Sequence, residues 1–203
     1  SMNQFGFGER TGIDISGEVE GLLPSREWKK NRFDQVWYPG DTISVGIGQG
    51  YFLATPIQLA VATSIIANKG NKVVPKLLLS GGNSQINLVS NFNSDSYLSN
   101  IEYVKDSMVA VTSSEGTAYS SAQNLNFKLA GKTGTAQVFS LRGRDYDEDK
   151  IQEKLKDHSL FVAFAPANTP KIAIALIIEN GGSGSAVAAP MASKILEYFL
   201  KKN

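Results

Sequence analysis

A lysine and two threonines, grouped in one tetrapeptide, are the first candidates for chemistry in this sequence. Lys132-Thr133-Gly134-Thr135 lies inside a run with the residue types of a β-strand. Lys-Thr-Gly is one of three short motifs, with Ser-x-x-Lys and Ser-x-Asn, that together build a serine acyl-transfer site. The tetrapeptide therefore predicts one wall of such a site.

The serine nucleophile that this site needs has no candidate in the 203 residues. No serine is followed three positions later by a lysine, and Ser193-Lys194 are adjacent instead. Ser1-Met2-Asn3 matches Ser-x-Asn by its letters, but serine before methionine at a chain start is typical of a cloning scar. We therefore expect residues 1–203 to be the C-terminal portion of a single domain whose upstream part carries the other two motifs.

The strand that we expect over residues 127–138 has little side-chain bulk at its centre. Gly131, Gly134 and Ala136 leave room for another backbone to approach closely. An extended peptide can bind along such an edge through main-chain hydrogen bonds. The pattern favours an open edge that accepts a peptide.

The strongest helix signal covers residues 56–69. Thr55 can cap this helix, Gln58 completes a capping box and Gly70 follows the last turn. Its apolar residues are spread so widely that we expect a helix buried on most sides.

Two more helices are expected, over about 100–115 and about 190–201. The first would begin with a capping box of Ser99 and Glu102 and end at Gly116. Its inward-facing residues would be Val104, Met108, Val109 and Val111.

Two apolar strands, over 159–165 and 171–178, are expected to form a hairpin across 166–170. The second is continuously apolar, which favours a strand covered on both faces. The fold class that follows is α+β, an antiparallel sheet flanked by helices in an α/β sandwich.

Composition excludes several classes of protein. The chain is 42% hydrophobic and 19% charged with a net charge of +1, so no nucleic-acid or anionic-membrane partner is indicated. It has no cysteine, which excludes disulfides and thiolate metal sites, and no apolar run long enough to cross a membrane. No cofactor is expected.

Three further features have structural interpretations. The charged stretch 140–157 is expected to be an exposed loop or short helix, with a lid as the less favoured alternative. His158 is expected to be hydrogen-bonded and structural rather than catalytic. Trp28 and Trp37 are expected to pack an irregular segment onto the sheet.

The order of several longer phrases resembles the C-terminal half of the transpeptidase domain of class B penicillin-binding proteins, over nearly the whole chain. These phrases are Phe5-Gly6-Phe7-Gly8, Thr11-Gly12-Ile13-Asp14, Gly21-Leu22-Leu23-Pro24-Ser25-Arg26-Glu27-Trp28, Trp37-Tyr38-Pro39-Gly40-Asp41-Thr42, Gly46-Ile47-Gly48-Gln49-Gly50-Tyr51, Thr55-Pro56-Ile57-Gln58, Gly131-Lys132-Thr133-Gly134-Thr135-Ala136-Gln137-Val138, Asp157-His158, Phe164-Ala165-Pro166 and Glu179-Asn180-Gly181-Gly182.

The resemblance implies a serine D,D-transpeptidase that cross-links peptidoglycan stem peptides and that β-lactams acylate. It implies that Lys132 supplies positive charge beside the serine and draws in the carboxylate of the substrate. Thr133 and Thr135 would donate hydrogen bonds to that carboxylate, and the backbone amide of Thr135 would be half of the oxyanion hole. Gly134 would keep the strand flat for the substrate.

The resemblance also implies a setting. The parent protein would be anchored in the inner membrane of a bacterium with this domain in the periplasm, and its partners would be membrane proteins of the cell-elongation machinery. Without the nucleophile, the 203-residue chain alone is expected to be inactive, and its exposed apolar surface favours dimers or aggregates.

Two other functions stay open. A β-lactamase or β-lactam sensor would share Lys132-Thr133-Gly134, although the phrases from Gly48 to Gln58 favour a biosynthetic enzyme. A non-catalytic interaction module is the alternative from a different class, and a cluster of donors on an open strand disfavours it.

Overall fold

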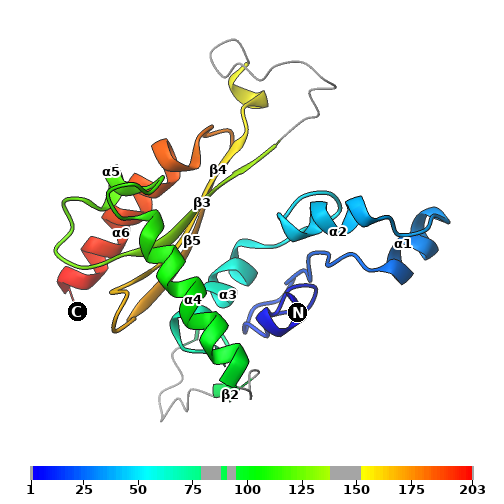
Figure 1. Cartoon of the computed structure of the whole chain (residues 1–203), viewed down its shortest axis with the longest axis horizontal. Coiled ribbons are helices and arrows are strands. Elements are labelled where there is room, and N and C mark those ends of the chain that lie inside the picture. The colour runs from blue at the N-terminus through cyan, green and yellow to red at the C-terminus, as the bar shows by residue number, and fades with distance from the viewer. Residues whose placement is uncertain (1, 79–87, 91–94, 138–151, 203) are drawn as a thin grey trace.

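A three-stranded antiparallel sheet lies at the centre of the chain, in the order β3 (Ala130–Ala136), β4 (His158–Ala165) and β5 (Ile172–Ile178). The computed structural model describes residues 2–78, 88–90, 95–137 and 152–202 (Figure 1). The expected hairpin of β4 and β5 is confirmed, with Ala165 opposite Ile172. All three expected strands are therefore present.

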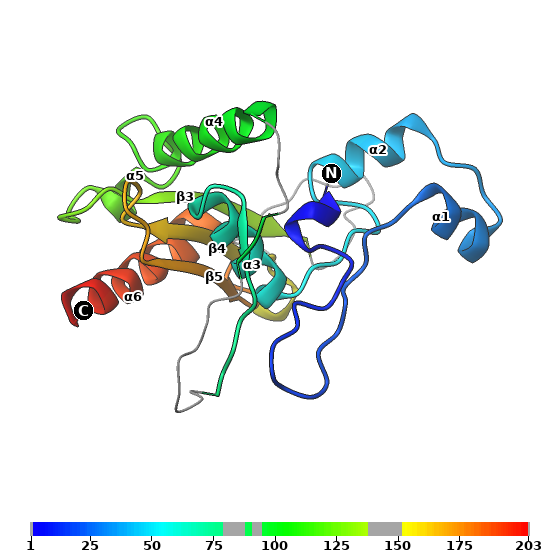
Figure 2. The same ribbon diagram turned by 90° about the horizontal axis from the view of Figure 1, so that it is seen from below.

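Helices cover both faces of this sheet. Figure 2 shows it between α4 (Asp95–Val111) and α6 (Ala189–Lys202), and α3 (Pro56–Ala67) packs on the α4 side against β4 and β5. On the α6 side, α5 (Tyr119–Ala122) and the single π-helical turn η3 (Gly184–Ala188) complete the cover. The predicted α+β sandwich is confirmed.

The core divides into clusters that follow the two faces. The cluster on the α6 face is built around fully buried Phe161 and Leu196. On the opposite face, Phe164 packs with Met108 of α4 and with the end of α3. β5 is less covered than its sequence suggests, because it forms the other edge of the sheet and Ile177 is 39% exposed.

Helix α3 begins as the sequence predicts. The hydroxyl of Thr55 accepts a hydrogen bond from the amide of Gln58, and the amide of Thr55 donates to Oε1 of Gln58. From residue 57 onward every side chain of the helix is buried or half-buried. Both the capping box and the extensive burial are confirmed.

Helix α4 differs from its prediction in both its start and its inward face. It begins by Asp95, an acidic residue that suits the positive end of the helix dipole. Ser99 lies inside the helix and its hydroxyl donates to the carbonyl of Ser96, so it is no cap. Ile101 and Met108 are buried, whereas Val104, expected to face inward, is 42% exposed.

Residues 23–52 form an arm that extends away from the sheet (Figure 1) and carries two helices absent from the sequence analysis, α1 (Arg26–Phe33) and α2 (Pro39–Gly46). At the base of the arm, Leu22 and Leu53 exchange two backbone hydrogen bonds of 2.7 and 2.9 Å. The expectation that Trp28 and Trp37 pack on the sheet is wrong.

Aromatic and polar contacts hold the arm. The ring of Trp28 lies 5.5 Å from that of Phe33 and 5.1 Å from that of Tyr51. Nζ of Lys29, whose side chain is only 5% exposed, donates to Oδ2 of Asp41 at 2.6 Å. This hydrogen bond from Lys29 is the main cause that lowers the pKa of the Asp41 carboxyl.

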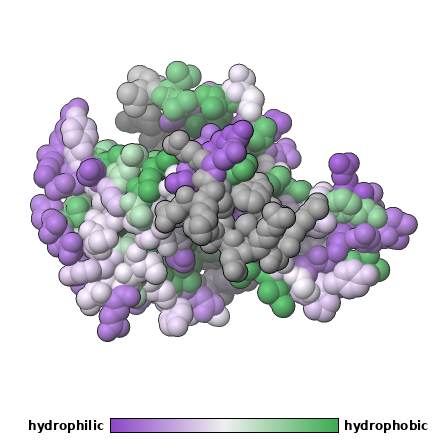
Figure 3. Space-filling model, turned by 90° about the horizontal axis from the view of Figure 1, so that it is seen from above, coloured by the Kyte–Doolittle hydropathy of each residue, from purple (hydrophilic) through white to green (hydrophobic). Residues whose placement is uncertain are grey.

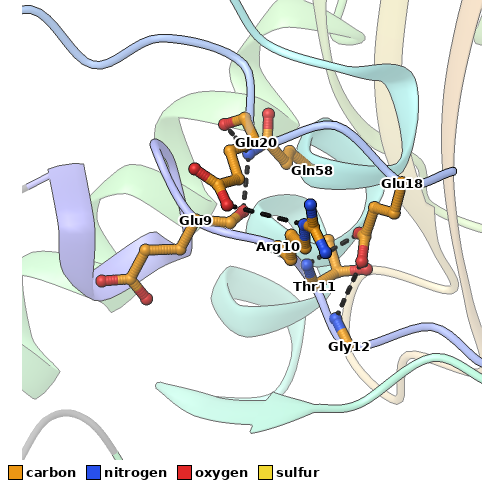
Figure 4. A network of polar contacts seen from close by, with 7 residues as sticks. All are labelled: Glu9, Arg10, Thr11, Gly12, Glu18, Glu20 and Gln58. Carbon is orange, nitrogen blue, oxygen red and sulfur yellow. Dashed lines mark hydrogen bonds and ion pairs between the residues drawn. The ribbon is translucent and has the colours of Figure 1, made fainter.

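A second polar network joins the N-terminal segments to α3 (Figure 4). Gln58, almost fully buried, donates from Nε2 to the carbonyls of Glu9 at 2.8 Å and Glu20 at 2.7 Å. Beside it, Glu18 accepts from the hydroxyl of Thr11, which is the main cause that lowers the pKa of that carboxyl.

The remaining described elements are short: η1 (Met2–Phe5), η2 (Glu153–Leu155) and the antiparallel pair of β1 (Asn71–Val73) and β2 (Leu88–Ser90). Most of the stretch 140–157, with the alternatives of loop and lid, falls outside the described residues. No helix in the described part of the chain is long and apolar enough to span a bilayer.

Candidate active site

The Lys-Thr-Gly-Thr segment lies on β3, at an edge of the central sheet. β3 pairs with β4 on one side, and among the described residues no strand pairs with its other side. Side chains alternate along a strand, so Lys132 and Gly134 face the α4 side while Thr133 and Thr135 face the α6 side. The three donor residues named from the sequence therefore lie on the edge strand, with the lysine side chain on one face of the sheet and the two threonine side chains on the other.

Lys132 lies beside this edge with its side chain largely exposed. Its Nζ donates to the carbonyl oxygen of its own neighbour, Thr133, at 2.6 Å. The Thr133 carbonyl must therefore point outward rather than toward β4. The same lysine lines an apolar hollow of about 540 Å³ between the N-terminal segment, α3 and α4, which also includes Val104, Met108 and Val162.

The backbone of Thr135 presents its N–H to the open edge. A Cβ placed on Gly184 would lie 2.3 Å from the carbonyl oxygen of Gly134 and 2.7 Å from that of Leu160, so both oxygens sit close together between the strands. That proximity identifies Gly134 and Leu160 as a hydrogen-bonded pair of the ladder. The next residue, Thr135, then directs its N–H away from β4, as the outward carbonyl of Thr133 also requires.

Thr117 is a site residue that the sequence analysis missed. Its hydroxyl lies 3.3 Å from the hydroxyl of Thr133. The loop after α4 turns back sharply to bring it there, with the amide of Ala118 donating to the carbonyl of Val111. A Cβ on Gly116 would lie 2.1 Å from that same carbonyl oxygen, so only glycine fits. A glycine followed by threonine at the end of a helix was the available signal.

The small residues of β3 do not all serve the purpose expected of them. A Cβ on Gly131 would lie 2.5 Å from Cζ of Phe161, so the space beside Gly131 is filled by a core side chain. The expectation that Gly131 leaves room for an approaching peptide is therefore wrong. At Gly134 a Cβ would lie 3.3 Å from the Cβ of Leu160, which is a tight contact but no severe overlap, and a flat substrate-binding strand stays a prediction there.

His158 has a structural role in this arrangement. It lies opposite Ala136 at the end of β3, and its Nδ1 accepts a hydrogen bond from the amide of Asn180 at 2.9 Å. The side-chain amide of Asn180 in turn donates to the carbonyls of Lys154 and Lys156. The histidine thus helps to fix the turn after β5, which confirms that it is hydrogen-bonded, and the absence of a catalytic role stays a prediction.

Comparison with sequence families identifies the family of this chain. The model for the penicillin binding protein transpeptidase domain matches residues 1–197. Among curated proteins, peptidoglycan D,D-transpeptidase MrdA of Escherichia coli K12 is 45% identical over 98% of this chain, and MrdA of Acinetobacter baumannii is 44% identical over 100% of it. The chain spans only 32% and 31% of these two relatives, about a third of their length.

Solved structures agree in fold. A complex between penicillin-binding protein PBP2 and MreC from Helicobacter pylori superposes with a TM-score of 0.87 at 32% identity, covering 100% of this chain and 35% of that one. Pseudomonas aeruginosa PBP2 in complex with WCK 5153 gives a TM-score of 0.79 at 40% identity, covering 98% and 42%.

Proposed function

Because this chain belongs to the penicillin-binding protein transpeptidase domain family, we propose that it is the strand-bearing part of a serine D,D-transpeptidase that cross-links peptidoglycan. The observation that carries the proposal is the open edge of β3, where the Lys132 ammonium, the Thr133 carbonyl and the Thr135 amide lie together. A stem peptide or a β-lactam would bind along this edge by main-chain hydrogen bonds.

The open edge of β3 supplies groups that the acyl-transfer reaction needs. A serine hydroxyl attacks the penultimate carbonyl of a D-alanyl-D-alanine peptide, and the carbonyl oxygen becomes negatively charged. The N–H of Thr135 would donate to that oxygen as half of an oxyanion hole. D-alanine then leaves with a proton, and the amine of a second stem peptide attacks the acyl-enzyme to form the cross-link and release the serine.

Lys132, Thr133 and Thr135 would bind the anionic end of the substrate. Among the residues that the structure describes, the Lys132 ammonium bonds a neutral carbonyl and forms no ion pair, so it can turn to a carboxylate without breaking one there. The Thr133 hydroxyl, when it accepts from Thr117, has its own hydrogen free to donate to that carboxylate.

The serine would come from a segment outside these 203 residues. The sequence holds no Ser-x-x-Lys, and the chain corresponds to about a third of its curated relatives. The apolar hollow beside Lys132 supports this arrangement, because a helix laid there would bury exposed Val104 and bring a serine toward Lys132. The proposed domain is therefore completed by a preceding segment that covers this hollow.

We place the complete protein on the outer side of the inner membrane, where peptidoglycan is built, in assembly with a membrane partner of the elongation machinery. The solved complex of the related PBP2 with MreC supports a partner of that kind. The MrdA relatives are named transpeptidases, which favours cross-linking over β-lactam hydrolysis or a non-catalytic role.

The test is acylation by a penicillin, read by intact mass. The 203-residue chain alone is expected to give no adduct, and a chain extended upstream to the length of its relatives is expected to give a single penicilloyl adduct on the serine of a Ser-x-x-Lys motif. An adduct on the short chain, or none on the folded extended chain, contradicts the proposal.

Lysine variants of the extended chain localise the site. Lys132→Ala is expected to slow acylation on the order of 100-fold, because the charge next to the serine and the substrate carboxylate is lost. Lys128→Ala is the matched control, since Lys128 is exposed just before the strand and contributes only its carbonyl, to the amide of Ala167. Equal effects of the two variants would remove Lys132 from the site.

A further inference from the structure

The turn η3 lies directly against the backbone of the candidate site. It is a π-helical turn at Gly184–Ala188, immediately before α6, on the face of the sheet that also carries the side chain of Thr135. π-Helical turns are rare and occur frequently at functional sites. This turn contacts both β3 and β4.

Gly184 is the point of contact. A Cβ there would lie 2.3 Å from the carbonyl oxygen of Gly134 and 3.0 Å from the nitrogen of the same residue. No side chain fits in that space, so the turn rests on the peptide groups of Gly134 itself. The carbonyl of Gly134 belongs to the same peptide group as the N–H of Thr135, so any shift of this contact rotates that N–H.

Ser159 holds the turn in place. This residue is fully buried and lies opposite Thr135 in the register of β3 and β4. Its hydroxyl donates to the carbonyl of Ser183 at 2.9 Å and accepts from the amide of Ala188 at 3.0 Å. The side chain of Ser159 thus links both ends of η3 to β4, at the position opposite Thr135.

We propose that η3, held by the Ser159 hydroxyl, is a positioning element that fixes the direction of the Thr135 N–H at the open edge of β3. Ser159 acts through the backbone and touches no substrate. The inference rests on the proposed function, because the Thr135 N–H is the oxyanion donor assigned there. It goes beyond that function by assigning a positioning role to Ser159 and to η3, neither of which contacts the substrate.

The test compares Ser159→Ala with Thr112→Ala in the extended enzyme. Thr112 is a matched control because its buried hydroxyl also joins two segments, sharing its hydrogen between the carbonyls of Leu129 and Val109, and neither of these bonds involves η3. Acylation by a penicillin is resolved into the rate constant of the acylation step and the dissociation constant of the initial complex. Both variants are expected to lower the melting temperature.

Ser159→Ala is expected to slow the acylation step by about 10-fold, a fraction of the 100- to 1,000-fold that loss of a whole oxyanion donor costs. The dissociation constant is expected to change by less than about twofold, because an oxyanion donor acts in the transition state. Thr112→Ala is expected to leave the acylation step unchanged. An unchanged rate constant in Ser159→Ala, or an equal loss in both variants, overturns the proposal.

A second measurement separates this inference from the proposed function. The amide resonance of Thr135 in the 203-residue chain is expected to shift in Ser159→Ala and not in Thr112→Ala, whether or not any acylation occurs. If the extended enzyme is not acylated, the proposed function fails and this shift still decides the role of η3. An unshifted Thr135 amide in Ser159→Ala overturns it.

Discussion

The sheet and the arm are stabilised in different ways. The sheet is held by close apolar packing, with Phe161, Phe164 and Leu196 fully buried between its helices. The arm is held by a cluster of aromatic rings and by polar contacts such as that of Lys29 with Asp41. Apolar packing on both faces stabilises the sheet, whereas the arm depends on a few specific contacts.

The surfaces of the two regions differ as well. On the arm, Val36, Tyr38, Ile43 and Ile47 are 57 to 67% exposed. Figure 3 shows apolar residues in green among hydrophilic ones on this side of the molecule, at the right. The difference teaches that the sheet is stabilised mainly by its own helices, while the arm presents apolar side chains that a further surface would cover.

The two regions can be followed separately in one sample. Both tryptophans of the chain, Trp28 and Trp37, lie on the arm. Tryptophan fluorescence therefore reports on the arm, and amide hydrogen exchange in β4 reports on the sheet.

The largest effect is expected from breaking the core of the sheet. Phe161→Ala should lower the free energy of unfolding by about 3–5 kcal/mol, because it empties the space beside Gly131. Both probes should then report unfolding together in a urea titration. If fluorescence keeps its original midpoint while β4 loses protection, the arm does not depend on the sheet and the comparison is wrong.

A smaller effect is expected from breaking the polar network that joins the N-terminal segments to α3 next to the base of the arm. Gln58→Leu leaves the carbonyls of Glu9 and Glu20 without their buried donor, at a cost of about 1–3 kcal/mol. The fluorescence midpoint should fall while protection in β4 changes little. Gln123→Leu, at an exposed glutamine, is the control and should change neither.

Acidification should affect the arm before the sheet. The hydrogen bond from Lys29 lowers the pKa of Asp41, so the folded arm holds fewer protons than the unfolded arm near that pKa. This contribution is fully present above the unfolded pKa of about 4 and is lost as the pH falls toward the folded one. The fluorescence midpoint in urea should therefore drop between about pH 5 and pH 3.

Asp41→Asn should lower the urea midpoint of tryptophan fluorescence at neutral pH, because the charged partner of Lys29 is lost. The midpoint should also depend less on pH, because the titrating group is gone. Asp34→Asn, which removes the carboxylate of an exposed pair with Lys30, is the control and should keep the original pH dependence. A loss of pH dependence in both variants would assign the acid sensitivity to the general charge of the arm.

The smallest effect on stability is expected at two exposed isoleucines, Ile43 in α2 and Ile47 directly after it. Ile43→Thr with Ile47→Thr should change the free energy of unfolding within about 0.5 kcal/mol, since both side chains are solvent-exposed. Self-association of the 203-residue chain at high concentration should decrease in sedimentation velocity. Ile195→Thr on α6 should not have that effect, and an equal decrease would locate the association elsewhere.

Elements with strong local signals could be predicted from the sequence. The capping box of Thr55 and Gln58 defines the start of α3, and the apolar runs of β4 and β5 define a hairpin. Lys132, Thr133 and Thr135 could be assigned to a strand edge because the motif and the strand pattern coincide.

The arm helices could not be predicted from periodicity, because α1 is mostly charged and buries only Lys29. The signals were local instead: the Ser25 hydroxyl accepts from the amide of Trp28, and Pro39 begins α2. Ser159 could not be assigned, because its contacts join segments far apart in sequence, and the only local signal for Thr117 was the glycine before it at the end of a helix.

The bridge between Leu22 and Leu53 has a consequence for how related chains can differ. The polypeptide enters and leaves the arm at this one pair of residues, so the arm is a loop that is closed at its base. The entropy of closing such a loop grows only slowly with its length. Insertions and deletions within the arm can therefore accumulate during evolution without disturbing α3, the sheet or the edge of β3.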